Sequence, residues 1–185
     1  LATLGENSFA VSGLSSFTAP QSVLTAINLT AGPNKTVGGK SGVEVSMQRF
    51  AIHGTGNLTK EDVLDAIGNG SGYANIIISG YITIESDAFS GSKLSGSITI
   101  SSSITTIGMS SFAQCSSLTS VIFESGSQLT TIGPGAFMFS GLSGSITLPS
   151  SLTSIGGSAF SYSSLTSVSF QSESQLSIGD EAFSS

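Results

Sequence analysis

Hydrophobic residues recur along the C-terminal part of the chain with a period of about 23 residues. The clearest copies pair an Ile with a Phe five positions later, and successive Phe residues are 23, 25, 23 and 23 positions apart. A fixed period of this length is typical of a solenoid, in which each repeat forms one coil and buries its apolar edge against its neighbours. The paired residues are therefore predicted to form the structural core: Ile84 and Phe89, Ile107 and Phe112, Ile132 and Phe137, Ile155 and Phe160, Ile178 and Phe183.

Each repeat also contains a strand-like segment in which apolar and polar positions alternate. Two forms of this segment follow one another along the chain: Leu94–Ile100 matches Leu142–Leu148, and Leu118–Phe123 matches Leu165–Phe170. Alternate residues are expected to point into the coil and out of it. Stacked coils place such strands side by side in a parallel sheet, with the rest of each coil as the crossover. The pattern predicts a mostly β repeat solenoid of about four to five coils over residues 76–185.

A glycine follows the Ile in four of the five copies, at Gly108, Gly133, Gly156 and Gly179. The chain is expected to turn tightly there, with a positive φ that glycine adopts without steric cost. Gly133→Val is therefore expected to lower the melting temperature more than removal of an exposed Ser hydroxyl in the same coil.

The repeat is interrupted in the N-terminal part of the chain. Residues 1–27 read as a partial repeat, because Phe9 follows Leu4 by five positions, but 80 residues separate Phe9 from Phe89. The intervening residues 28–75 begin with a stretch rich in Gly, Asn and Lys, which predicts a loop or linker. Three regions are expected: the partial repeat 1–27, a linker with a cap or insertion over 28–75, and the array 76–185.

The second half of this interruption predicts a strand and a short helix. Val43–His53 can alternate as a strand, and Gly54–Gly56 is expected to form a turn. Thr59 is a suitable N-cap, acidic residues follow it in the first turn, and Gly68 is a suitable stop. A helix of about eight residues is marginal alone. We therefore expect it to pack on the open end of the solenoid and to start the array.

Charged residues are sparse, and the cationic ones form no cluster. Charged residues make up 9% of the 185 residues, against roughly 25% in a typical soluble protein. The net charge is −6, and the five Lys and Arg residues are scattered, which excludes the phosphate-neutralising cluster that nucleic-acid binding needs. No apolar run approaches the ~20 residues of a membrane span. No signal peptide is present, and the chain starts in mid-repeat at Leu1, so we expect a mature or excised piece.

Catalytic chemistry finds little support in the sequence. His53 is the only histidine and Cys115 the only cysteine, and they lie in different segments. No Ser-His-Asp, Cys-His or metal-ligand spacing can be assembled from them, so neither an enzyme, a cofactor nor a metal is predicted. Cys115 is expected to be a small residue in a turn, because serines fill its position in other copies. The acidic pairs Glu85/Asp87 and Asp180/Glu181 are expected to solvate the corners of the coils.

The repeat resembles a known family. Leu165–Phe170 reads Leu-Thr-Ser-Val-Ser-Phe, and Ser151–Phe160 reads Ser-Leu-Thr-Ser-Ile-Gly-Gly-Ser-Ala-Phe. These phrases resemble the BspA-like (Treponema-type) leucine-rich repeats of microbial surface proteins, over residues 76–185 throughout and 1–27 less cleanly. The resemblance implies a right-handed leucine-rich solenoid at the cell surface or outside the cell, and members commonly act as adhesins. The usual Cys after Ala-Phe is kept only at Cys115.

The outward positions of the long strands are the candidate ligand-binding face. They are uncharged and mostly hydroxyl-bearing, and the chain has no Trp. Such a face suits weak, repeated contacts to a glycan or an extended protein surface, multiplied by avidity; the alternative is a plain solvated sheet. The candidate residues are Ser95, Ser97, Thr99, Thr119, Ser120, Ile122, Ser143, Ser145, Thr147, Thr166, Ser167 and Ser169.

Three functions remain open at this point. The first is an adhesive module that binds host protein, a cell surface or glycan. The second is a structural spacer or filament subunit whose solenoid ends stack head to tail. The third is an ice- or surface-binding Thr ladder built on Thr105/Thr106, Thr130/Thr131 and Thr153/Ser154, against which the irregular 23/25 spacing argues.

Four Asn-x-Ser/Thr sequons lie in the interruption. In a secreted eukaryotic protein they would be candidate glycosylation sites on exposed loops. In a bacterium they would usually carry no meaning, and chance matches are common in a chain so rich in Ser and Thr. The four residues are Asn28, Asn34, Asn57 and Asn69.

Overall fold

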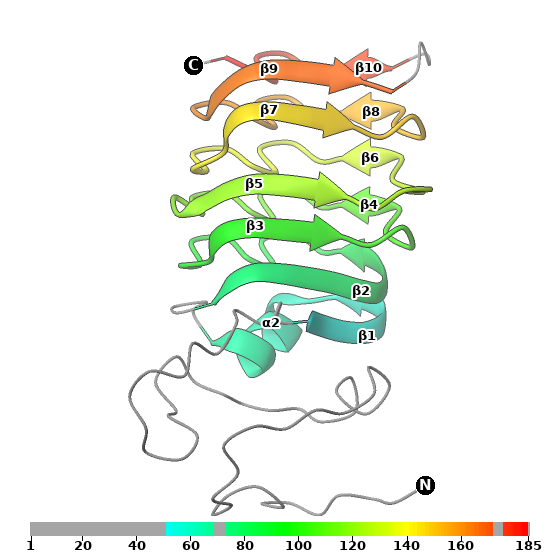
Figure 1. Ribbon diagram of the computed structural model, residues 1–185, viewed down its shortest axis with the longest axis vertical. Helices are drawn as coiled ribbons and strands as arrows, with labels where there is room; N and C mark the ends of the chain where they lie inside the picture. The colour runs from blue at the N-terminus through cyan, green and yellow to red at the C-terminus, as the bar shows by residue number, and fades with distance from the viewer. Residues whose placement is uncertain (1–50, 69–72, 172–175, 185) are drawn as a thin grey trace, which may run out of the picture. The chain divides into compact units, whose positions relative to one another are not determined.

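The computed structural model describes residues 51–68, 73–171 and 176–184 (Figure 1). The chain divides into two compact units, Leu1–Gln48 and Arg49–Ser185, and every described residue lies in the second. The predicted partial repeat 1–27 and the sequons at Asn28, Asn34 and Asn69 fall outside the described residues.

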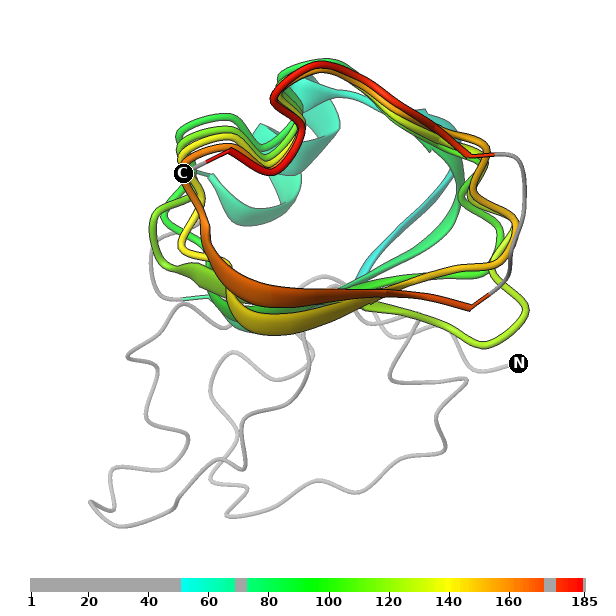
Figure 2. The ribbon, with the colours of Figure 1, turned by 90° about the horizontal axis from the view of Figure 1, so that it is seen from above.

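The described residues form a parallel β-solenoid. It begins with strand β1 (Ala51–Leu58), helix α2 (Lys60–Ile67) and the long strand β2 (Ala74–Ile84). Each later coil then contributes one long and one short strand, and Figure 2 shows these coils superimposed along the stacking axis. The remaining strands are β3 (Ser95–Ile100), β4 (Thr106–Ile107), β5 (Leu118–Phe123), β6 (Thr131–Ile132), β7 (Ser143–Leu148), β8 (Ser154–Ile155), β9 (Ser164–Phe170) and β10 (Ser177–Ile178).

Two stacks of strands result, one on each side of the coil. The short strands pair in the order β2, β4, β6, β8, β10, so that Thr83, Thr106 and Thr131 are register partners. The long strands pair as β2, β3, β5 and, in a separate sheet, as β7 and β9. β2 is long enough to belong to both sides, because its first half pairs with β3 and its end pairs with β4. The predicted repeat solenoid with a parallel sheet is therefore confirmed.

The core of the solenoid is a ladder of stacked phenylalanines. Neighbouring ring centroids lie 4.8, 5.0, 5.2 and 5.1 Å apart along Phe89, Phe112, Phe137, Phe160 and Phe183. The rings are nearly parallel, with interplanar angles of 12°, 1°, 8° and 2°. The first four side chains are fully buried, and each such burial contributes roughly 1.5–3 kcal/mol. The isoleucines of the first four corners, Ile84, Ile107, Ile132 and Ile155, are also buried.

The last corner departs from the predicted core. Ile178 is 48% exposed and Phe183 is 36% exposed, although both occupy the same repeat positions as their buried counterparts. Phe183 stacks on Phe160 with one face, and no described coil covers its other face. A ring in this stack is fully buried only when it has a neighbouring ring on both faces. Phe183 is the last ring among the described residues, so one of its faces is not covered by them.

The predicted helix is confirmed at both ends. Thr59 is the N-cap, and its side chain accepts a hydrogen bond from the Asp62 backbone N–H at 3.1 Å. The Asp62 carboxylate accepts in return from the Thr59 hydroxyl and backbone N–H, and these bonds hold the pKa of Asp62 below its usual value. Gly68 forms the C-cap with φ +57°.

Helix α2 takes the place of a corner in the first coil. Leu58 is the register partner of Ile84, and Val63 follows Leu58 by five positions, as Phe follows Ile in later coils. Val63 and Ile67 are buried in the same core, and α2 lies at the N-terminal end of the strand stack (Figure 1). The helix therefore covers the end of the stack that the first Phe rung would otherwise expose.

The strand before this helix differs from the prediction. The turn expected at Gly54–Gly56 lies inside β1, and the register of β1 against β2 shifts around Gly56. Gly56 has φ +78°, so the three residues form a bulge rather than a reversal. Gly54 lies against the ring of Tyr81, where a Cβ would overlap the side chain. The glycines thus permit a close approach between neighbouring groups inside a strand. Residues 43–50 of the predicted strand lie outside the described part.

The corner glycines are required for a different reason from the one predicted. None of Gly108, Gly133, Gly156 and Gly179 has a positive φ. A Cβ on Gly133 would instead lie 2.7 Å from the backbone nitrogen of Met109, one coil earlier. The positive φ falls two residues later, at Ser110 (52°) and Gly135 (59°). The first glycine therefore permits the close approach of two backbones, and the turn itself tolerates other residues.

Gly133→Ala is expected to lower the free energy of unfolding by about 2 kcal/mol, because the added methyl meets backbone that cannot rotate away. The matched control is Gly135→Ser in the same corner, where the equivalent residue of the preceding coil is Ser110 and an added Cβ meets nothing nearer than 3.6 Å. Chemical denaturation of both variants measures the difference. Equal destabilisation by the two changes would contradict the close-approach explanation.

Ser111→Ala is expected to stabilise the protein by about 1 kcal/mol, because the Ser111 hydroxyl is buried with no hydrogen-bond partner. The other four corners already carry Ala at this position, at Ala88, Ala136, Ala159 and Ala182. Thermal unfolding should show a rise of a few degrees. Ser169→Ala, which removes an exposed hydroxyl, is the control and should leave the midpoint unchanged; a lower midpoint for Ser111→Ala would contradict the prediction.

Candidate ligand-binding face and groove

The twelve predicted face residues lie on the outward side of β3, β5, β7 and β9, the long strands in front in Figure 1. None of them is buried. Strand register aligns them in rows, since Ser97 pairs with Ser120 in one sheet and Ser145 pairs with Ser167 in the other. The parallel sheet thus brings together residues that are more than 20 positions apart in the sequence.

Eleven of the twelve residues carry a hydroxyl, and four of these hydroxyls are already used inside the sheet. Thr119 Oγ1 donates to the Gly96 carbonyl at 2.9 Å, and Thr166 Oγ1 donates to the Gly144 carbonyl at 3.1 Å. Ser97 Oγ donates to Asn75 Oδ1 at 2.9 Å, and Ser95 Oγ donates to the Tyr73 carbonyl at 3.2 Å. A hydroxyl bonded to the neighbouring coil supports the stack and is less available to a ligand.

The other hydroxyls of the face make no hydrogen bond to any described residue. Most of them lie on β7 and β9, and Ser120 faces them from β5. The hydroxyls without hydrogen-bond partners are therefore concentrated in the later coils of the face rather than spread evenly along it. These residues are Thr99, Ser120, Ser143, Ser145, Thr147, Ser167 and Ser169.

The long-strand sheet is interrupted inside this region. Within the described residues, β5 pairs with β3 alone, and β7 and β9 form a separate two-stranded sheet. In other coils the residue after the long strand donates its N–H to the coil before, as Glu124 does to the Ile100 carbonyl at 3.0 Å and Gln171 to the Leu148 carbonyl at 3.3 Å. The corresponding residue after β7 is Pro149, which has no N–H. The backbone donor is therefore absent at the place where the pairing between the long strands β5 and β7 is interrupted.

Bend length widens the same opening. Seven residues lead from the end of β3 (Ile100) to Ile107, and seven from the end of β7 to Ile155, but nine lead from the end of β5 to Ile132. The yellow-green bend after β5 consequently projects beyond the golden bend that follows it (Figure 2). A recessed coil next to a projecting one leaves a depression between them.

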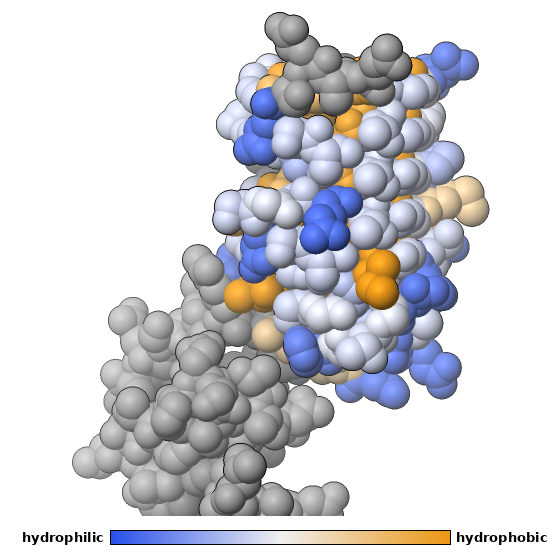
Figure 3. All heavy atoms as spheres, turned by 90° about the vertical axis from the view of Figure 1, so that its right-hand side faces the viewer, coloured by the Kyte–Doolittle hydropathy of each residue, from blue (hydrophilic) through white to orange (hydrophobic). Residues whose placement is uncertain are grey.

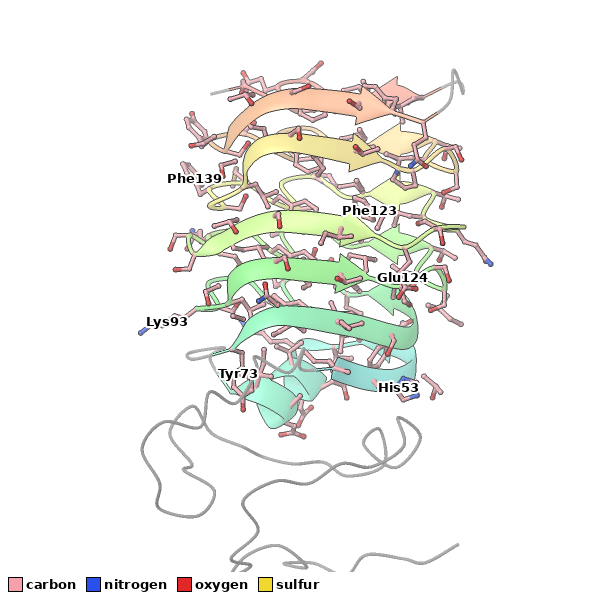
Figure 4. All side chains as sticks on the ribbon, in the orientation of Figure 1. His53, Tyr73, Lys93, Phe123, Glu124 and Phe139 are labelled. Carbon is pink, nitrogen blue, oxygen red and sulfur yellow. The ribbon has the colours of Figure 1, made fainter. Side chains whose placement is uncertain are left out.

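An open groove of about 290 Å³ occupies this depression. One wall is β5 with its bend and the other is β7. Figure 4 shows Phe123 near the end of β5 and Glu124 lower, beside the end of β3. Glu124 is held in place, because its Oε2 accepts a hydrogen bond from the Ser102 backbone N–H at 3.1 Å. The lining residues are Ser120, Val121, Ile122, Phe123, Glu124, Ser125, Ser145, Thr147, Pro149 and Gln171.

The electrostatics of the groove are weakly acidic. Glu124 is the one charged side chain among the described residues that line the groove. The two lysines of the described part, Lys60 and Lys93, lie elsewhere, on α2 and before β3. The surface on the side where the long strands end is mostly of near-neutral hydropathy, with isolated hydrophilic and apolar side chains (Figure 3). The described residues of the groove therefore offer hydroxyls, an amide and one carboxylate, and among them is no cation for an anionic ligand.

The structure does pair the single histidine with a serine, which the sequence interpretation did not foresee. His53 Nδ1 lies 3.1 Å from Ser79 Oγ, since the two residues are register partners in β1 and β2. Both lie on the outside of the solenoid, and no carboxylate among the described residues is bonded to the imidazole. The pair lacks the orienting group that completes a catalytic triad. Nor does any group of three His, Cys, Asp or Glu side chains in the described part gather closely enough to hold a metal ion.

Cys115 is a buried part of the corner. Its thiol donates to the Phe89 carbonyl at 3.1 Å and lies 3.4 Å from the Ser92 hydroxyl. Burial raises the pKa of Cys115, which disfavours the reactive thiolate. The cysteine takes the place that serine fills in neighbouring coils.

The Asn57 side chain and three of the hydroxyls of the Thr ladder make hydrogen bonds to other groups. Asn57 is exposed on β1, and its amide donates to Glu85 Oε1 at 3.1 Å. The hydroxyls of Thr105, Thr130 and Thr153 donate to backbone carbonyls one coil earlier, at 3.2, 3.1 and 3.1 Å. These ladder hydroxyls bond the coils to one another, which weakens the interpretation of the ladder as an ice-binding lattice.

Sequence reasoning missed an exposed aromatic pair. Phe139 and Tyr162 stack with ring centroids 4.5 Å apart and are 46% and 60% exposed. Both have φ 56°, at a position that Gly91 and Gln114 occupy in the earlier coils. The signal was available, because each follows a ladder Phe by two positions. Figure 4 shows Phe139 at the side of the stack where the long strands begin, away from Glu124.

A leucine-rich solenoid with one accessible strand face is the class of protein that these features define. The model of the BspA type leucine rich repeat region matches residues 69–185 with six copies, and the chain belongs to this family. Among the curated proteins, none matches the chain significantly.

One solved structure is similar to part of the chain: the crystal structure of the pneumococcal vaccine antigen PcpA, at 37% sequence identity and a TM-score of 0.45. The match covers 60% of this chain and 27% of the PcpA chain. Within the described residues, α2 is eight residues long, and no helix is long and apolar enough to cross a membrane.

Pro149→Ala is expected to extend the ladder between β5 and β7, because it restores the N–H that can donate to the Phe123 carbonyl. Amide hydrogen exchange at residue 149 should then be as slow as at Glu124 and Gln171, which make the equivalent bond. Pro134→Ala is the control, since Pro134 is an exposed corner residue outside the strands. Fast exchange at residue 149 would show that bend length alone keeps the groove open.

Proposed function

We propose that the protein is a non-enzymatic binding module of a microbial surface protein, which docks its long-strand face on host protein, a cell surface or glycan. The observation that carries this proposal is the concentration of hydroxyls without hydrogen-bond partners on β7, β9 and Ser120. Membership of the BspA-type repeat family supports a repeat-built binding module and a location at the cell surface.

The physical argument for this face is its combination of rigidity and free polar groups. The strands are held by backbone bonds to neighbouring coils and by the stacked core beneath them. A ligand therefore meets a preformed surface and orders little protein on binding. Single hydroxyl contacts are weak, so binding by this face depends on several rows acting together.

The alternative, a filament subunit that stacks its ends head to tail, has less support. Ile178 and Phe183 form an exposed apolar end, which would favour such a contact. The opposite end of the coil stack, however, is covered by α2, whose Val63 and Ile67 are buried in the core. Head-to-tail stacking of coil on coil would require that helix to be displaced.

The test is retention of the full chain on immobilised matrix proteins and on a glycan array. The double variant Thr147→Lys/Ser169→Lys adds two long charged side chains to the free rows and is expected to reduce retention by roughly tenfold or more. Ser86→Lys makes the same chemical change at an exposed corner and serves as the control. Undiminished retention of the double variant would overturn the proposal. Growth of long particles with concentration in light scattering would favour the filament instead.

A further inference from the structure

We propose that the groove between β5 and β7 is a subsite for one neutral sugar residue of a glycan, with Glu124 and Thr147 as its main polar contacts. This inference rests on the proposed function, because it assigns a ligand chemistry to one part of the same face. The face supplies many weak hydroxyl contacts, whereas the groove supplies a concave site whose lining residues include Glu124, with its carboxylate bonded to the coil of β3.

The polar groups of the groove complement a polyol. Ser120, Ser145 and Thr147 carry hydroxyls that both donate and accept and that make no hydrogen bond to a described residue. Gln171 adds an amide with both capacities, and Glu124 Oε1 accepts no hydrogen bond from the described residues. Adjacent hydroxyls on a sugar ring also donate and accept, so one ring can satisfy groups on both walls at once. Ile122, which is 48% exposed, offers an apolar contact for the C–H side of the ring.

Charge selects a neutral ring over an acidic one. No Lys or Arg is among the described residues that line the groove, and Glu124 would repel a carboxylate, sulfate or phosphate. The whole chain carries a net charge of −6, which adds to the same preference. The matching ligand is therefore a neutral sugar, and acidic sugars are the natural comparison.

The size and attachment of the walls favour a sugar over an added peptide strand. A volume of about 290 Å³ lies at the small end of ligand sites, which typically span about 300–1,000 Å³. The two coils stay bonded at the start of the strands, where the Gly141 N–H donates to the Cys115 carbonyl at 3.1 Å. They also stay bonded on the far side, where Thr131 of β6 pairs with Ser154 of β8. Walls fixed on both sides of the opening cannot part by the ~4.8 Å that another strand needs.

The carboxylate is positioned before a ligand arrives. Glu124 begins the projecting bend after β5, and the Ser102 N–H holds its Oε2. Its backbone N–H is bonded to the Ile100 carbonyl, so both ends of the residue are tied to the coil below. A side chain with few freedoms left loses little entropy when it accepts a sugar hydroxyl.

The test is a titration of the full, isotope-labelled chain with single sugars, followed by amide NMR. Glucose, galactose, mannose and N-acetylglucosamine are the neutral probes, and N-acetylneuraminic acid is the acidic comparison. At least one neutral sugar is expected to shift amides of β5 and β7 near the groove, with a dissociation constant of about 1–10 mM. Glu124→Gln keeps the side-chain size and should weaken binding by roughly fivefold or more. Glu85→Gln, at a corner outside the groove, should leave it unchanged.

Two results would overturn the subsite: no neutral sugar shifts the groove amides, or the acidic sugar binds as well and Glu124→Gln has no effect. The retention assay separates this outcome from a failure of the proposed function. If the Thr147→Lys/Ser169→Lys variant loses retention while no sugar binds the groove, the face is a binding surface and the groove is not its sugar subsite. If a neutral sugar binds the groove but the chain is retained nowhere, the subsite stands and the adhesive role falls.

Discussion

The distance between successive coils is the constraint on which the rest of the structure depends. Backbone hydrogen bonds fix neighbouring strands about 4.8 Å apart, and the phenylalanine rings stack at 4.8–5.2 Å. Because both spacings are the same, the ladder of rings and the ladder of strands reinforce each other in every coil. Any group that increases the spacing locally, such as a Cβ on Gly133, disturbs both ladders at once.

The same spacing decides which surface hydroxyls bond to a neighbouring coil and which remain without a hydrogen-bond partner. Threonine hydroxyls that reach the coil below, such as those of Thr105, Thr130 and Thr119, donate to its carbonyls and support the stack. Hydroxyls on β7 and β9 that do not reach a carbonyl remain available to a partner. On a surface of uniform composition, the hydroxyls without hydrogen-bond partners are therefore confined to one region, and the position of that region follows from hydrogen-bond geometry rather than from residue type.

The groove arises where the regular spacing is relaxed. Pro149 removes one donor, and the long bend after β5 moves the wall outward, while the corners and the short strands β6 and β8 stay bonded. The opening is therefore local and has rigid edges. This arrangement lets a repeat scaffold acquire a concave site without an inserted loop, and Glu124, the one charge among the described groove residues, directly follows β5.

The sequence by itself determined the repeat, the inward Ile and Phe positions and the helix with its Thr59 and Gly68 caps, because periodicity and capping depend on residues close in the chain. It also identified the outward rows, whose role in binding remains a proposal. The prediction of a turn at Gly54–Gly56 was wrong, because these residues form a bulge. The prediction that Gly133 has a positive φ was also wrong, because this glycine instead permits the close approach of two backbones. Both features depend on a neighbouring coil. Only the tertiary structure decided which hydroxyls are free, that Phe183 ends the described ladder half-covered, and that Pro149 opens a groove. Each of these depends on contacts between residues about 23 positions apart, which a local pattern does not contain.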